Sequence, residues 1–457
     1  MRLSHAVSSI DVRFDDPNLV GVAGLVPVVA LAHRAGLGDL TDRHVRINAE
    51  GGANPGLKVA GIVAGMTAGA DSIDDLDVLR HGGMSRLFDG TRAPSTNGTF
   101  LRAFRFGHVR QLDAAAARFA AALAAHTPVL PGRETVCFVD VDDTVKATYG
   151  YQKEGAGYGY SKVKGLNALI ATMCTPAGAP VVVATRLRKG STGSARGAAR
   201  LVADALVTAR AAGASGLVIM RADSAFYNHK VLAAAHRQGA RFSVTARMDT
   251  AVRRAIAAIP DHAWVPIRYP DAIFDDQEQR WISDAEVAET TYTAFTSRAA
   301  GEQVTARLIV RRVKRLNPKT TSSGQDPLFD TWRHHGVFTD SPMTMLQAES
   351  QHRGHAIVET VIADLKAGPL AHLPSGKFTA NAAWLVLAAI AYNLLRAAGA
   401  LASVFHAKAT TATIRAQLIN VPARIATSAR RLVLHLPTDW PWEPAWQQLF
   451  DRAVRPA

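Results

Sequence analysis

The pattern of apolar and polar residues changes character at Pro131. From residue 18 to residue 125, apolar runs of helical spacing alternate with short polar turns, which predicts a helical region. After Pro131 the apolar residues gather in β-type runs, TVCFVDVDDT, LNALIATMC and APVVVATRL, which predict a three-stranded meander. The elements expected next are a helix at 195–213, a strand at 217–223, a helix near 228–238 and a strand at 240–247. The order βββαβαβ is typical of an α/β fold.

The second half of the chain also alternates between β-like and helical patterns. Residues 250–340 combine short β-like segments with polar loops, and we expect the stretch 316–327 to be an exposed loop. Helical periodicity returns at 344–367 and is ended by Gly368 and Pro369.

The sequence favours a protein of the cytosol over a membrane or secreted protein. The stretch Ala382–Phe405 is long and apolar enough to be considered as a membrane span, but Asn393 and Arg396 interrupt it. We therefore expect a buried core helix there. No apolar run directly follows the basic N-terminus, which argues against a signal peptide. Two cysteines, Cys137 and Cys174, cannot form a disulfide framework and fit a reducing compartment.

Basic side chains outnumber acidic ones, and the excess is concentrated in two blocks. The 457 residues include 52 Lys and Arg against 38 Asp and Glu, a net charge of +14. Residues 131–240 hold 14 basic and 7 acidic side chains, and residues 346–457 hold 11 and 6, so the two blocks carry 12 of the 14 excess charges. Such a balance favours a polyanionic partner such as nucleic acid. We therefore expect both basic blocks to contribute to the same functional site.

Carboxylates at two strand ends and on one helix are candidates for a metal site. Asp140 and Asp142 lie two apart at the end of an apolar strand, so both point to one face. Asp223 closes the next buried strand, and Glu359 lies inside the helix HRGHAIVETVIADLK. Each could be structural alone, as an Asx turn or a solvated helix face. Gathered together they would repel one another unless a divalent cation neutralised them, which predicts a Mg²⁺ site.

The helix around Glu359 presents this acid on a polar face. At 100° per residue, His352, His355, Glu359 and Lys366 fall within about 60° of one another, opposite an apolar face. A metal-binding carboxylate beside phosphate-binding cations would show this arrangement. Zinc is disfavoured because no cysteine lies nearby in the sequence.

Three segments together resemble a known enzyme family. They are FVDVDDTVKATYGYQKEGAGYGYSKVKG, VIMRADSAFYNHKVL, and HAIVETVIADLK with ANAAWLVLAAIAYNLLR. Over about residues 10 to 450 the chain resembles the DDE transposases of bacterial insertion sequences, most closely the family numbered thirteen-eighty.

The family motifs match this chain residue by residue, with two departures. The first Asp of the family stands in an Asp-x-Thr motif, here at Asp142, and the second in an Asp-x-x-Phe motif, here at Asp223. The helix pattern Tyr-x-x-Arg-x-x-x-Glu-x-x-x-x-x-x-Lys matches at Glu359 and Lys366. Histidines stand at its Tyr and Arg positions, which leaves the phosphate-contact role of those positions open and makes the neighbouring Arg353 an alternative cation.

The resemblance implies an α/β fold with an RNase H-like catalytic core, interrupted by a β-rich insertion and flanked by a helical N-terminal region and a helical C-terminal segment. It implies catalytic carboxylates Asp142, Asp223 and Glu359 that hold two Mg²⁺ ions, with Mn²⁺ as a substitute and Asp140 as an additional candidate ligand. The candidate DNA-phosphate-binding residues are Lys366, Arg353, His352, His355, Arg188 and Lys189, with Arg186 and Arg221 as further basic groups near the core.

The implied function is cut-and-paste transposition by a cytoplasmic, nucleoid-associated bacterial enzyme. The expected partners are DNA, as terminal inverted repeats and target, and a second copy of the chain in a synaptic homodimer, with no membrane. The expected domains are a DNA-end-binding region at 1–130, the first part of the core at 131–249, the insertion at 250–343, the Glu helix and following helix at 344–400, and a basic segment at 401–457.

Two alternatives to this function stay open. A strand ending in Asp-x-Asp-x-Thr also resembles the nucleophile loop of haloacid dehalogenase-type phosphatases, in which Asp140 would attack phosphate and Asp142 would act as acid and base. The other alternative is a catalytically inactive, DNA-binding relative of a transposase.

Overall fold

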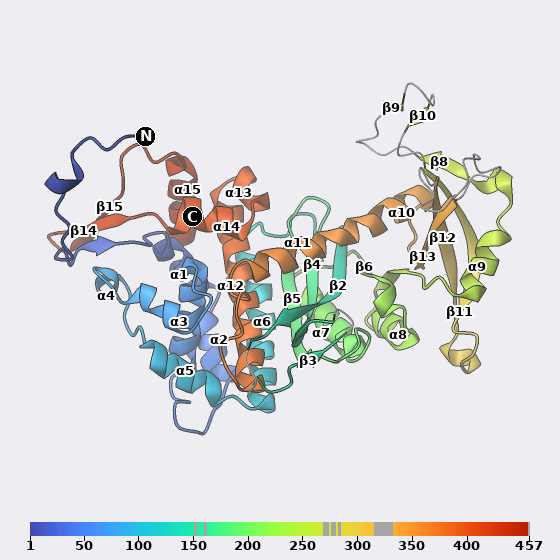
Figure 1. The fold of residues 1–457 in the computed structure, drawn as a ribbon, viewed down its shortest axis with the longest axis horizontal. Helices are drawn as coiled ribbons and strands as arrows, with labels where there is room; N and C mark the ends of the chain where they lie inside the picture. The colour runs from blue at the N-terminus through green and yellow to red at the C-terminus, as the bar shows by residue number, and fades with distance from the viewer. Residues whose placement is uncertain are drawn as a thin grey trace.

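The computed structural model describes residues 1–149, 153–159, 162–267, 274–275, 280–281, 285–314 and 332–455. Figure 1 shows an elongated molecule in which a helical region, a central sheet and a β-rich region follow one another along the long axis. Both chain termini lie at the helical end. The expected loop at 316–327 lies outside the described residues.

Helices from both ends of the chain build the helical region. In α6 (Phe106–His126), Leu112, Phe119 and Leu123 recur at helical spacing and are buried. They face α12 (Phe378–Ala402), which also contacts α3 and α15. The other elements here are η1 (Val7–Ser9), α1 (Leu25–Arg34), α2 (Leu37–His44), α3 (Pro55–Ala68), η2 (Asp74–Leu79), α4 (Met84–Leu87) and α5 (Pro94–Arg102).

Helix α12 serves as the core helix of this region. It is the one described helix that is long and apolar enough to cross a membrane, and 94% of its most apolar window is buried inside the protein. The polar residues that interrupt it have partners. The side chain of Asn393 binds both the amide and the carbonyl of Val182 at 2.7 Å, and Arg396 donates to the carbonyls of Ala407 and Ala409.

The segment after α12 is helical only in part, so the expectation of a helical C-terminal segment was wrong for residues 423–435. A strand, β14 (Ala423–Ser428), lies between β1 (Leu19–Val20) and β15 (Arg431–His435) in an antiparallel sheet. Ala423 and Ile425 are buried while the residue between them is exposed, the period of two that strands require. The helical parts are α13 (Val404–Lys408), α14 (Thr411–Ile414), η7 (Arg415–Ile419) and α15 (Glu443–Val454).

The central sheet combines antiparallel and parallel strands. Its long first strand, β2 (Val136–Ala147), pairs antiparallel with β4 (Lys164–Cys174) and parallel with β6 (Leu217–Ala222). Beyond these, β5 (Val181–Lys189) pairs with β4, and β7 (Arg241–Thr245) pairs with β6. The remaining elements are β3 (Gly157–Tyr158), α7 (Ala198–Ala211), η3 (Ser224–Phe226) and α8 (His229–Arg237).

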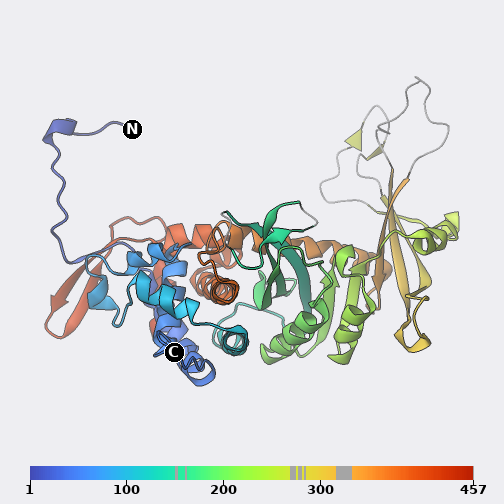
Figure 2. The same ribbon diagram turned by 60° about the horizontal axis from the view of Figure 1, so that its bottom comes forward.

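Helices cover both faces of the central sheet, as Figure 2 shows. Cys137, Val139 and Val141 of β2 pack in one apolar cluster with α7, whereas Phe138 packs in another with Ile357 at the start of α11 (Ile357–Lys366). Odd-numbered residues of β2 therefore face α7, and even-numbered residues face α11. Before α11 lie α10 (Met345–Arg353) and the short turn η6 (Gly354–Ala356).

The β-rich region extends the central sheet instead of forming a separate one. β13 (Trp332–Thr339) pairs with β7 on one side and with β12 (Val304–Lys314) on the other. On its other side β12 pairs with β11 (Ala285–Ala294), and these two strands form a long antiparallel hairpin. The other elements are α9 (Thr250–Ala257), η4 (Asp261–Ala263), β8 (Val265–Ile267), β9 (Phe274–Asp275), β10 (Arg280–Trp281) and η5 (Ala300–Glu302).

Candidate active site

Two carboxylates meet where β6 ends beside the interior of β2. Val141 of β2 pairs with Ala222, the last residue of β6, so the residues that follow, Asp142 and Asp223, lie next to each other. The expectation that Asp140 and Asp142 end their strand was wrong, because β2 continues to Ala147 through its pairing with β4. Burial, together with repulsion from Asp223, raises the pKa of Asp142 to about 6 against the opposing backbone hydrogen bond from Asp143. The pKa of Asp223 is also raised, chiefly by burial. Two like charges are thus held close together in a partly desolvated place.

Local hydrogen bonds orient both carboxylates. Asp223 is the N-cap of η3 and accepts a hydrogen bond from the amide of Ala225 at 2.9 Å. Asp142 accepts one from the amide of Asp143 at 2.7 Å. The structural interpretation as a turn residue is thus realised for Asp223, whereas Asp142 lies inside β2 and is not part of a turn.

Asp140 lies two residues before Asp142 in an entirely different environment. Its side chain is fully buried and accepts two hydrogen bonds from Arg221, at 2.6 and 2.7 Å, and forms a third with Nδ1 of His355 at 3.1 Å. Burial by itself would raise the pKa of Asp140, but the charge of Arg221 and the bond from His355 outweigh it and hold the pKa below its usual value. A carboxylate with these partners fits an internal ion pair better than a metal ligand or a nucleophile.

Asp143 points to the opposite face of β2 and also forms an internal ion pair. Its partners are Arg188, the side-chain amide of Asn167 at 2.8 Å and the hydroxyl of Ser194 at 3.1 Å. Arg188 is buried and additionally donates to the carbonyls of Ser194 and Arg196. This placement does not suit contact with DNA phosphates, whereas the adjacent Lys189 is exposed.

The helix with the predicted polar face is broken in the structure. The η6 turn at Gly354–Ala356 separates α10 from α11, so His352 and Glu359 belong to different helices. His352 is buried between the hydroxyls of Ser243, at 3.0 Å, and Thr245, at 2.9 Å. Burial first, then the nearby His355 and Arg221, lower the pKa of His352 to about 3. A neutral, enclosed imidazole cannot serve as a cation for phosphate.

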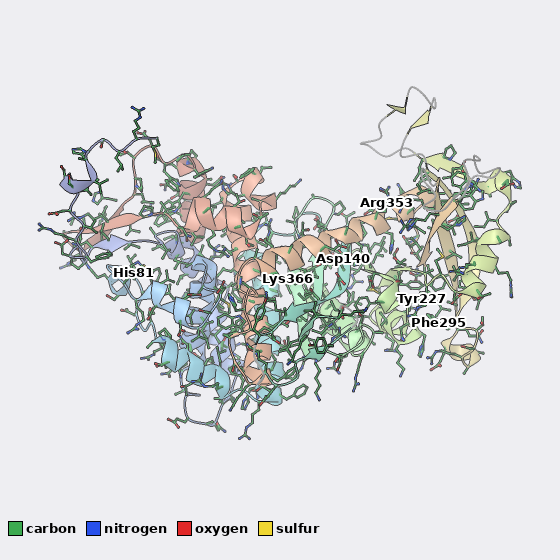
Figure 3. The ribbon with its side chains drawn as sticks, viewed as in Figure 1. His81, Asp140, Tyr227, Phe295, Arg353 and Lys366 are labelled. Carbon is green, nitrogen blue, oxygen red and sulfur yellow. The ribbon has the colours of Figure 1, made fainter. Side chains whose placement is uncertain are left out.

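His355 and Lys366 lie close to the paired carboxylates. The charge of His355 lowers the pKa of both Asp142 and Asp223, so this imidazole lies between them and Asp140. Burial and repulsion from Lys146 lower the pKa of Lys366, while Asp142 acts in the opposite direction. Figure 3 shows Lys366 at the far end of α11, with Asp140 in the sheet beneath.

Glu359 is not gathered with the two aspartates. It lies exposed in the first turn of α11. Within the described ranges, no group of three or more His, Cys, Asp or Glu side chains could hold a metal ion. Arg353 donates to both carboxylate oxygens of Glu349 at 3.0 Å.

The donor chemistry nevertheless fits a hard divalent cation at two of the three predicted ligands. Asp142 and Asp223 offer carboxylate oxygens, which Mg²⁺ prefers, and their mutual repulsion would be relieved by a cation. The structure brings these two together and leaves Glu359 apart.

Sequence reasoning missed two features of this site. Arg221, expected at the DNA backbone, is enclosed with Asp140 and lies 4.1 Å from the ring centre of Phe138. Lys146, which was not singled out, shares the face of Asp142 and approaches Lys366. The period of two along β2 could have identified Lys146, but the pairing of Arg221 depends on the register between β2 and β6, which places it beside Asp140.

Comparison with known proteins covers nearly the whole chain. The sequence model of the family described as Transposase DDE domain group 1 matches residues 4–455. No curated protein matches the chain at significant similarity.

Proposed function

The chain belongs to the DDE transposase family, and from this premise we propose that it catalyses Mg²⁺-dependent strand cleavage and strand transfer at the ends of a bacterial insertion sequence of the family numbered thirteen-eighty. The observation that carries the proposal is the pair Asp142 and Asp223, held side by side where β6 ends against β2, with raised pKa values. Family membership implies a transposase that acts on DNA; the metal and the reaction course are the proposed part.

Asp142 and Asp223 would hold the metal, with Glu359 of α11 completing the ligand set. Mg²⁺, or Mn²⁺ in its place, would provide Lewis-acid activation of a water or of the DNA 3′-hydroxyl and charge stabilisation of the leaving oxygen. Asp140 is a positioning residue in this proposal because its carboxylate is already paired with Arg221 and His355. It fixes the imidazole that lies next to the two metal-binding aspartates.

The phosphate-binding set is narrower than the sequence alone implied. Lys366 lies beside Asp142 and suits a phosphate near the cleaved bond. Lys189 is exposed, Arg353 pairs with Glu349 at the end of α10, and His355 lies next to the two aspartates, so these three stay in the set. His352 and Arg188 are enclosed by other partners, so we leave them out. Backbone contacts by such cations bind DNA without sequence preference and weaken in salt.

The domain organisation and assembly belong to the same proposal. The order β5–β4–β2–β6–β7 supports an RNase H-like core at 131–249, completed by α10 to α12 within 344–400. Residues 1–130 would bind the inverted repeats, 250–343 would be the insertion, and 401–457 would be a basic accessory segment. We propose a synaptic homodimer that acts in the bacterial cytoplasm at the nucleoid.

One observation favours a second candidate, the inactive DNA-binding relative. Glu359 is exposed and apart from the aspartates, so the ligand set is incomplete as it stands. The phosphatase alternative has no such support, because its nucleophile, Asp140, is fully buried in an ion pair.

A cleavage assay separates these functions. DNA carrying the ends of the element is incubated with Mg²⁺ and either the wild type, Asp142→Asn, Asp223→Asn or Glu359→Gln. Because each substitution removes a charge that would bind the metal, each is expected to slow cleavage by at least about a hundredfold. Glu443→Gln, an exposed carboxylate at the start of α15 in the helical region, away from the central sheet, is the matched control and should cleave normally.

A second readout does not depend on cleavage. Mg²⁺ should raise the melting temperature of the wild type and of Glu443→Gln, but not that of Asp142→Asn, because only a folded metal site gains stability from the ion. Binding of DNA ends without cleavage by the wild type, and no Mg²⁺ effect, would instead identify the inactive relative.

A further inference from the structure

The first residues of the chain form an arm that packs on nothing in its own molecule. Residues 1–15 are all exposed, and Figure 2 shows the arm leaving the body of the protein. Its large apolar side chains include Val12, 76% exposed, and Phe14, fully exposed. Water around so many apolar groups is unfavourable, so an arm of this composition favours a surface that covers it.

The arm has the pattern of a strand without a partner. Ile10, Val12 and Phe14 alternate with Asp11, Arg13 and Asp15, so the apolar residues lie on one side of an extended chain. Within the described part of the chain, the backbone groups of residues 11–15 form no backbone hydrogen bond with another element. Strand pairing would satisfy these groups and bury the apolar side at once.

A matching free edge exists in the small sheet of the helical region. β15 lies at the edge of the sheet β1–β14–β15, and the opposite side of β15 is unpaired in the described structure. Leu432 is 45% exposed and Val433 is 37% exposed there. An open edge with apolar side chains is a template for another strand.

Charge favours the same pairing. Residues 423–436, which form β14 and β15 with their connection, hold three arginines and no acidic residue. The strand-like part of the arm, residues 10–15, holds Asp11 and Asp15 against the single Arg13. The surface thus suits an acidic, apolar strand better than a basic one, and DNA would not cover the apolar side chains of the arm.

The arm of the same molecule starts on the wrong side of this sheet. Asn18, just before β1, accepts a hydrogen bond from the amide of Ile425 at 2.9 Å, and Asp16 pairs with Arg424 at 3.2 Å. The arm is therefore fixed to β14 at the β1 edge, with β14 standing between it and the free edge of β15.

We propose that residues 10–15 of the arm add as a strand to the free edge of β15 in a second copy of the chain, and that the second copy returns its arm in the same way. A reciprocal exchange uses the same patches on both chains and closes a symmetric dimer. The inference concerns the chain without DNA and does not depend on the proposed cleavage.

Crosslinking between two chains tests which copy the arm reaches. Val12→Cys is placed in one tagged chain and Val433→Cys in another of different mass, and the mixture is oxidised. Both native cysteines are buried, so the wild-type mixture is the control. A disulfide joining the two chains is expected. A third sample is a single chain that carries both Val12→Cys and Val433→Cys. The proposal would be overturned if the mixture gave no crosslink, or if a disulfide formed only within the doubly substituted chain.

Sedimentation of the full chain without DNA tests the energetics. The double variant Val12→Lys and Phe14→Lys should dimerise at least about tenfold more weakly than the wild type, because it puts charges where apolar anchors pair. Ser8→Lys with Ser9→Lys adds the same charge at polar positions of the arm and should leave the dimer intact. Since all four positions are exposed, an unchanged melting temperature checks folding.

Two outcomes of the sedimentation experiment contradict arm exchange. One is a wild type that stays monomeric at every concentration. The other is an equal loss of dimer in both lysine variants, which would mean that added charge alone disrupts the contact.

A separate DNA-binding measurement on the same variants distinguishes the remaining possibility. Loss of DNA binding by Val12→Lys with Phe14→Lys, without loss of dimer, would assign the arm to DNA instead.

Discussion

The face of β2 that looks toward α11 contains two acidic environments that differ sharply although they lie two residues apart. At Asp140 the negative charge is enclosed and matched by Arg221 and His355, and the pKa is lowered. At Asp142 the charge faces a second carboxylate, Asp223, and the pKa is raised. The matched charge contributes to the stability of the fold, whereas the unmatched pair is available for a cation. A motif containing both aspartates therefore divides into a residue that is paired inside the fold and a residue that we propose as a metal ligand.

The largest effect expected from this difference is on stability. Asp140→Ala leaves Arg221 buried without its partner, so the free energy of unfolding should fall by about 3–5 kcal/mol. Asp142→Asn removes repulsion and should not lower it. Urea unfolding followed by circular dichroism measures both. Equal destabilisation by the two substitutions would remove the distinction between the two environments.

A smaller effect on stability is expected from acidic pH. It arises from His352, which is buried against Ser243 and Thr245 of β7. Its pKa is about 3 in the folded protein and about 6.5 when unfolded, so the unfolded chain binds the extra proton between these values. Stability should thus fall as the pH drops below 6.5, and this histidine should contribute a loss of about 2 kcal/mol between pH 7 and pH 5.

The variant His352→Gln isolates that contribution. Glutamine cannot gain the proton, so its stability should change less over the same pH range than that of the wild type. His5→Gln, an exposed histidine in the arm, is the matched control and should keep the wild-type slope. Parallel pH curves for wild type and His352→Gln would show that the buried imidazole does not oppose protonation.

The smallest effect is expected for Lys189 and concerns DNA affinity, and its neighbour Arg188, which is enclosed in a buried ion pair, provides the comparison. Lys189→Ala should weaken DNA binding modestly and reduce the slope of log affinity against log salt by about one, as loss of one phosphate contact does. Arg188→Ala should instead lower thermal stability, because Asp143 loses its buried partner. A filter-binding titration at several salt concentrations and a thermal melt check the pair. An unchanged salt slope for Lys189→Ala would place the DNA elsewhere.

The sequence predicted the local elements of the core well, because their signals are local. The strands and helices from Val136 to Thr245 occur in the order that the apolar runs predicted. The buried helix at 378–402 was predicted because its apolar stretch contains few polar residues. The strands of the C-terminal segment were missed because β14 and β15 are short and gain stability only by pairing with each other and, for β14, with the distant β1.

The candidate site was predicted in part for the same reason. Asp142 and Asp223 could be named because each ends an apolar run. The separation of His352 from Glu359 could not, since the η6 turn interrupts a pattern that reads as continuous helix. Nor could the enclosure of Arg188, which depends on side chains of β2, β4 and the loop after β5.

By itself the sequence determined the mixed α/β class of fold and the DDE transposase family, and it singled out Asp142 and Asp223, because short-range periodicity and motif spacing are written along the chain. Only the tertiary structure decided which charges are matched. Asp140 and Asp142 are the same residue type on the same face of β2. Their environments differ because the register between β2 and β6 places Arg221 beside Asp140, and the end of β6 places Asp223 beside Asp142. Electrostatic pairing depends on distance in space, and no residue pattern along one chain fixes that distance.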